Sequence, residues 1–146
     1  MKRIYKFMAV TASLLLLSLN SCSDKNDSTP VDELAGIAKF KEVITDLHTI
    51  ELYSPSGNLE QGYNEVSIRI KDNASGKYIK NAEMTWMPMM HMAMMNHSGP
   101  NSAIEKATES GTVYQGYIVF QMPQNATEYW DLKLNYTIEG VSFTNT

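Results

Sequence analysis

The stretch that decides the fold class is YWDLKLNYTI, residues 129–138. One set of alternate positions is apolar: Trp130, Leu132, Leu134, Tyr136 and Ile138. The positions between them are polar: Asp131, Lys133, Asn135 and Thr137. Successive side chains of a β-strand point to opposite faces, so this period of two predicts a strand with one face in the core and the other in water. A strand with one buried and one solvent-exposed face is typical of antiparallel sheets.

Working outward, four other stretches alternate or have the composition of strands. They cover residues 113–122, 78–87, 63–72 and 43–53, the last as one strand or a pair of strands. Turns rich in Gly, Pro, Asn and Ser separate them. Trp86 is similar to the inward-facing Trp of immunoglobulin-like sandwiches, although their disulfide is absent. The sequence therefore predicts an all-β, immunoglobulin-like antiparallel β-sandwich.

The end of the chain predicts a short last strand. Glu139 and Gly140 have the composition of a hairpin turn, and the residues from Val141 onward begin a strand that stops at Thr146. We expect either a sandwich whose last strand is short or a truncated form of a longer protein.

Composition narrows the function classes. The 146 residues include 12 Lys and Arg against 16 Asp and Glu. Three of the bases and none of the acids lie in residues 1–21, so the other 125 residues carry nine bases and 16 acids, a net charge of −7. A domain this acidic is unsuited to binding nucleic acid by charge. The single cysteine excludes an internal disulfide, a Cys-rich zinc site and an iron–sulfur cluster.

The N-terminal residues have the pattern of a secretory signal. Lys2, Arg3 and Lys6 precede an apolar run over residues 8–19, which is shorter than a membrane-spanning helix. The run ends in Leu-Asn-Ser-Cys at residues 19–22, which resembles a bacterial lipobox with Cys22 as the acylated residue. A plain signal peptide followed by a chance cysteine is the alternative.

A lipid on Cys22 predicts an exported lipoprotein of the bacterial cell envelope. Its acyl chains, palmitate among them, would anchor it to the outer membrane, on the periplasmic or the surface face. The polar segment after Cys22 looks like that of lipoproteins of Bacteroidetes. We predict a signal peptide over residues 1–21, a flexible tether over 22–36 and the sandwich domain over 37–146.

Methionine is concentrated in one segment. Seven of the ten methionines fall within residues 84–95, and two of the three histidines lie within or just after them. Thioether sulfur is a soft ligand that suits Cu(I), and imidazole is a second suitable ligand. In an extended chain Met87, Met89 and His91 share one face, so their side chains could converge on one ion. Pro88 lacks a backbone N–H, and we expect it to end any central strand.

The segment therefore has two interpretations. The first is a Cu(I) site with six candidate ligands and with Met94 and Met95 in reserve: Met87, Met89, Met90, His91, Met92 and His97. Methionine also fills irregular apolar space and forms adaptable contact surfaces. The second interpretation is a loop that packs across the end of the sandwich or binds an apolar partner.

Residues 63–136 resemble the YtkA-like (FixH-like) domain. The similar features are MPMMHM at residues 87–92, GTVYQGY at 111–117, FQMP at 120–123 and a strand beginning at Trp130. The resemblance implies an immunoglobulin-like β-sandwich outside the cytoplasm, associated with copper handling and respiratory oxidase assembly. It also implies that the Met/His loop comprises residues 87 and 89–92, and extends to Met122.

No enzyme motif is visible, because the chain lacks a nucleophile elbow, a zinc-protease helix, a P-loop and a dinucleotide glycine pattern. We therefore predict a binding protein and not an enzyme. It either holds Cu(I) for delivery to a copper-acceptor protein or uses the Met-rich loop as a metal-independent surface for an envelope partner.

Overall fold

The computed structural model describes residues 32–146, so the predicted signal peptide, Cys22 and most of the predicted tether lie outside it. Within this range the chain forms nine strands and no helix, and nothing in it could cross a membrane as a helix. In chain order the strands are β1 (Ala38–Ile44), β2 (His48–Ser54), β3 (Gly62–Asp72), β4 (Glu83–His91), β5 (Asn96–Ser98), β6 (Glu105–Lys106), β7 (Tyr114–Phe120), β8 (Tyr129–Ile138) and β9 (Val141–Asn145).

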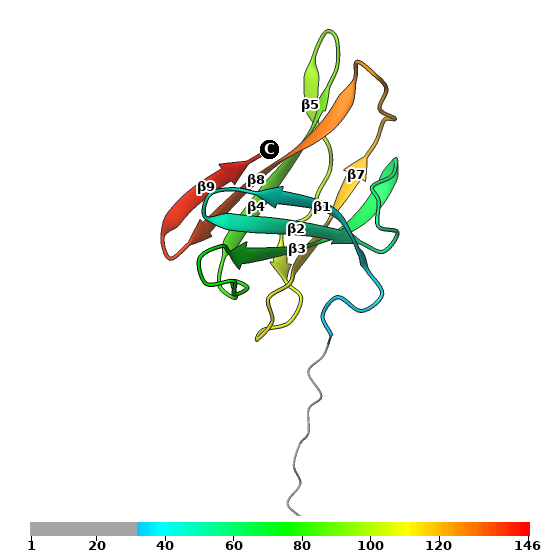
Figure 1. Ribbon diagram of the computed structural model, residues 1–146. Coiled ribbons are helices and arrows are strands. Elements are labelled where there is room, and N and C mark those ends of the chain that lie inside the picture. The colour runs from blue at the N-terminus through cyan, green and yellow to red at the C-terminus, as the bar shows by residue number, and fades with distance from the viewer. Residues whose placement is uncertain (1–31) are drawn as a thin grey trace, which may run out of the picture. The chain divides into compact units, whose positions relative to one another are not determined.

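The strands form two antiparallel sheets (Figure 1). One sheet has the order β1-β2-β3-β7-β6, and the other has the order β5-β4-β8-β9. Strands β2, β3, β7 and β6 follow the A-B-E-D order of an immunoglobulin sheet, and β4, β8 and β9 follow the C-F-G order. The predicted immunoglobulin-like β-sandwich is confirmed, with β1 and β5 as additional edge strands.

The core lies between the sheets and is built from the alternate apolar positions of the strands. Its buried residues are Ile50, Leu52, Val66, Ile68, Ile70, Met84, Trp86, Tyr114, Ile118, Phe120, Leu134 and Tyr136. Trp86 is 7% exposed, and its indole N–H donates to the carbonyl of Ser102 at 2.8 Å. Gly116 on the facing sheet makes room for it, since a Cβ there would lie 2.7 Å from Trp86 Cζ2.

Strand β4 differs from the prediction at both ends. It begins at Glu83 instead of residue 78, and it continues through Pro88 to His91. The expectation that Pro88 ends the strand is wrong for a local reason. Its carbonyl accepts the Gly99 N–H at 3.0 Å on the side away from β8, so its nitrogen faces the same side, just beyond the last residue of β5, and takes no part in the pairing with β8. The Asn101 amide donates to the Gly99 carbonyl at 3.0 Å in its place.

The other boundaries agree with the sequence in part: β1 begins at Ala38, five residues before the predicted stretch, and the short strands β5 and β6 were not predicted. The stretch at residues 43–53 is a pair of strands, and the last strand is short, with every residue of β9 paired to β8. Asp32 to Gly36, predicted as tether, form a turn that is held to the domain. The Glu33 carboxylate accepts hydrogen bonds from the Thr108 hydroxyl and the Thr112 N–H, each at 2.8 Å.

Candidate functional site

The β4–β5 hairpin carries the candidate ligands. Its register pairs Met89 with Ser98, Met90 with His97, and His91 with Asn96. A four-residue connection, residues 92–95, joins the strands and is closed by a hydrogen bond from the Met92 N–H to the Met95 carbonyl at 3.1 Å. Figure 1 shows the hairpin at the upper end of the sandwich.

Three of the candidates lie on the outer face of the four-stranded sheet. Met87, Met89 and His91 occupy alternate positions of β4 and are exposed or half-buried, whereas the residues between them point into the core. We call these three residues the outer-face row. Met87 is 42% exposed, and the His91 side chain is 31% exposed. The predicted common face of these three side chains is present in the fold.

His91 is held in place from strand β8. Its Nε2 atom lies 2.7 Å from Asp131 Oδ2, and the Tyr129 ring stacks on the imidazole with centroids 4.9 Å apart. An ionised carboxylate only accepts hydrogen bonds, so the Nε2 atom must carry the proton that is shared with Asp131. The Nδ1 atom has no hydrogen-bond partner among the described residues and remains a donor atom for a ligand.

Two other candidates lie on the opposite face of the same sheet. Met90 is 0% exposed and points into the sandwich. His97 is its cross-strand neighbour, so it shares this inner face, and its ring makes an edge contact with Trp130 at 5.7 Å. The sheet therefore separates His97 from His91, and the six predicted ligands do not converge on one point.

The remaining methionines of the segment lie in the connection. Met92 is half-buried at its first position, whereas Met94 and Met95 are 92% and 63% exposed. Met122 lies elsewhere, after β7, where its carbonyl accepts the Trp130 indole N–H at 2.9 Å. That contact places Met122 beside the inner-face residues and away from the outer-face row.

Sequence reasoning missed Asp131 and Tyr129 as neighbours of His91. The alternation in residues 129–138 had placed Asp131 on the wet face of its strand, but only the pairing of β4 with β8 shows which residue it meets. In residues 32–146 no group of three or more His, Cys, Asp and Glu side chains is arranged to hold a metal ion. A metal bound on the outer-face row would need thioether ligands.

A second polar cluster lies on the outer face of the five-stranded sheet, and its carboxylate is bonded to other members of the cluster. Glu51 accepts hydrogen bonds from the hydroxyls of Tyr53 at 2.8 Å and Tyr78 at 3.1 Å, and Lys39 lies 3.5 Å away. Burial alone raises the pKa of Glu51, but these contacts outweigh burial and hold the pKa below its ordinary value. Burial and the Glu51 contact raise the pKa of Tyr53 to about 12. The cluster is structural, because its carboxylate is already satisfied.

Comparison of the chain with models of protein families, with curated proteins and with solved structures finds no match. The similarity of residues 63–136 to the YtkA-like domain therefore stays a prediction from the sequence, and the site has to be interpreted from its own chemistry.

Proposed function

We propose that this chain binds Cu(I) through the outer-face row. The observation that supports the proposal is an oriented imidazole in line with two accessible thioethers on one strand. Met89 lies between Met87 and His91, about 6.6–6.8 Å along the strand from each. The ion would lie between Met89 and the fixed His91 ring, and the long side chain of Met87 would reach toward it.

The contact between Asp131 and His91 favours metal binding over a purely structural histidine. Histidine ligands commonly donate their second ring N–H to a carboxylate, which fixes the ring and raises the basicity of the ligating nitrogen. Here the 2.7 Å contact from Nε2 leaves Nδ1 for the ion. Two thioethers and one imidazole form a soft donor set, which suits Cu(I) or Ag(I) and is unsuited to Zn²⁺.

Titration of the full-length chain, in non-ionic detergent, with Cu(I) against a colorimetric chelator tests the proposal. We expect one Cu(I) per chain, displacement of that ion by Ag(I), and no displacement by Zn²⁺. Cu(I) that stays entirely with a chelator of micromolar affinity would contradict the proposal.

We also propose that the chain is an exported lipoprotein, anchored through Cys22 to the envelope, where it would pass copper to an acceptor protein. The support is the sequence of residues 1–22, which lie outside the described part. Cells that express the chain are expected to incorporate radiolabelled palmitate into it, and Cys22→Ser is expected to abolish the label and release the protein from membranes. Equal labelling of both forms would contradict the proposed anchor.

A second candidate function rests on the exposed tip of the β4–β5 hairpin. Met94 and Met95 are 92% and 63% exposed, and methionine side chains are adaptable contacts for an apolar partner. This alternative predicts an envelope partner whose binding is unchanged by a copper chelator and is lost when both methionines are replaced by Ser.

A further inference from the structure

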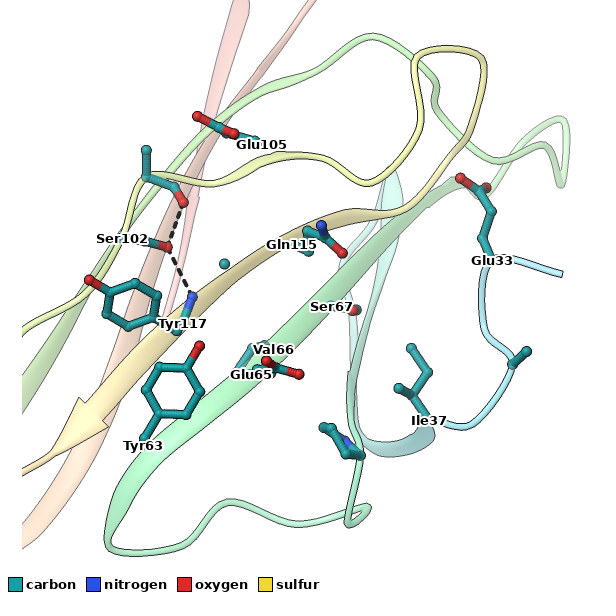
Figure 2. A pocket seen from close by; sticks show the side chains of 14 residues that line it. Glu33, Ile37, Tyr63, Glu65, Val66, Ser67, Ser102, Glu105, Gln115 and Tyr117 are labelled. Carbon is teal, nitrogen blue, oxygen red and sulfur yellow. Dashed lines mark hydrogen bonds between the residues drawn. The ribbon is translucent and has the colours of Figure 1, made fainter. Parts of the chain in front are cut away.

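A groove of about 550 Å³ lies on the outer face of the five-stranded sheet, whereas the methionine segment belongs to the four-stranded sheet. Its floor is formed by β3 and β7, and residues 33–37 and 102–105 form its sides. Figure 2 shows Tyr63 and Tyr117 at one end of it and Glu33 with Ile37 at the other. The volume is in the range of small-molecule sites. We call it the tyrosine groove.

The two tyrosines form an exposed aromatic pair. Tyr63 on β3 and Tyr117 on β7 have ring centroids 5.2 Å apart with an angle of 31° between their planes. They are 61% and 38% exposed, although rings of this size are more often covered. The face of an aromatic ring carries partial negative charge and attracts a cation placed over it.

The charged side chains of the groove all have one sign. Glu65 is the cross-strand neighbour of Tyr117, and Glu105 lies opposite Gln115 on the edge strand β6. Neither Glu65 nor Glu105 makes a hydrogen bond or an ion pair within residues 32–146, and the lining contains no Lys or Arg. Such a lining disfavours anions such as phosphate, because no positive group would pair with them.

Glu33 adds negative charge at the far end of the groove. Burial alone raises its pKa, but hydrogen bonds from the Thr112 N–H and from the Thr108 and Thr112 hydroxyls, together with the positive charge of Arg69, outweigh burial and lower it. It therefore stays ionised near neutral pH. The carboxylates are nevertheless too far apart to chelate a metal ion, since no three of them converge within residues 32–146.

We propose that the tyrosine groove binds a small organic cation that carries an alkylammonium group. The aromatic pair supplies cation–π contacts, the unpaired carboxylate of Glu65 supplies charge complementarity beside both rings, and the volume fits a small molecule. Carboxylates alone would indicate only a solvated surface. The exposed tyrosine pair in the same groove is the independent observation that favours an organic cation.

The test compares choline with its neutral isostere 3,3-dimethylbutan-1-ol by isothermal titration of the full-length chain in non-ionic detergent. Choline is expected to bind about tenfold more tightly than the neutral alcohol, because the two differ only in charge. Glu65→Gln and Tyr117→Leu are each expected to weaken choline binding about threefold to fivefold. Glu83→Gln, which removes an exposed carboxylate from β4 on the other sheet, is the matched control and is expected to leave binding unchanged.

Three results would overturn the proposal. They are equal affinity for choline and the neutral alcohol, full affinity in Glu65→Gln, and no choline binding at millimolar concentration. Binding of a neutral oligosaccharide that is unaffected by Glu65→Gln would assign the tyrosines to sugar stacking instead. Nα-acetyl-lysine amide, which carries a primary alkylammonium group, is a further arm, and its binding alongside choline with the same dependence on Glu65 would support the proposal.

Discussion

Replacing His91 by Gln is expected to lower the affinity of the chain for Cu(I) by about a hundredfold or more, because loss of a ligand costs at least as much as loss of a group that orients one. Glutamine keeps a polar side chain of similar length on the exposed face and lacks an imidazole nitrogen. His91 is on the outer face of the sheet, so the substitution leaves the core intact. Competition with the chelator used for the unsubstituted chain measures the change.

The matched control is His97→Gln on the other face of the same hairpin. His97 has the same side chain in the same segment, but the sheet lies between it and the outer-face row. We expect the affinity for Cu(I) to be unchanged in this variant. Equal losses from both substitutions would contradict the outer-face row and would require the hairpin to rearrange around the ion.

Asp131→Asn separates the positioning of His91 from ligation. The amide can still contact the imidazole, but it can also donate, so Nε2 is no longer required to carry the proton. We expect a loss of affinity of about tenfold to a hundredfold. Unchanged binding would mean that Asp131 only stabilises the fold.

The sequence predicted the faces of the strands well and their neighbours poorly. The alternation in residues 129–138 identified β8 with its bounds, and that in residues 63–72 identified β3 to within one residue. Alternation is a local property, so it can be read from a single stretch of chain. The contact between His91 and Asp131 joins residues 40 positions apart, and it depends on a pairing that no local pattern encodes.

Residue 97 illustrates the limit more sharply. The sequence places both histidines in one segment, and a single metal site follows if His97 folds back onto His91. The face that His97 occupies is set by the register of the β4–β5 hairpin, and a shift of one residue would move it to the other side of the sheet. The prediction that Pro88 ends the strand failed for a similar reason, because the cost of its missing N–H depends on which edge of the strand it faces.

No pattern in the sequence predicted the tyrosine groove. Tyr63 and Tyr117 each occupy an outward position in an alternating strand, where single aromatic residues are common. Only the pairing of β3 with β7 brings the two rings to 5.2 Å from each other. Binding sites assembled across strands in this way are determined by topology, so a single sequence predicts the scaffold more readily than it predicts the site.

Met90→Ala is expected to lower the free energy of unfolding by about 2–5 kcal/mol, because Met90 is fully buried and truncation leaves a cavity that the surrounding strands fill only in part. Met90→Leu keeps the volume and is expected to cost less than about 1.5 kcal/mol. Urea unfolding followed by tryptophan fluorescence measures both, since Trp130 lies opposite Met90 on β8.

A comparison with Met94 at the hairpin tip distinguishes a packing role of Met90 from a metal-binding role. Met94→Ala removes the same side chain at a position that is 92% exposed, and we expect it to change stability by no more than about 0.5 kcal/mol. If Met90→Ala were equally mild, the inner face of β4 would not be packed as the fold requires. If Met90→Leu left stability unchanged but removed Cu(I) binding, Met90 would be a ligand and the outer-face row would be the wrong site. A large loss of stability in Met90→Ala, together with copper binding retained in Met90→Leu, would assign the methionines of β4 to two separate tasks, core packing on one face of the strand and metal binding on the other.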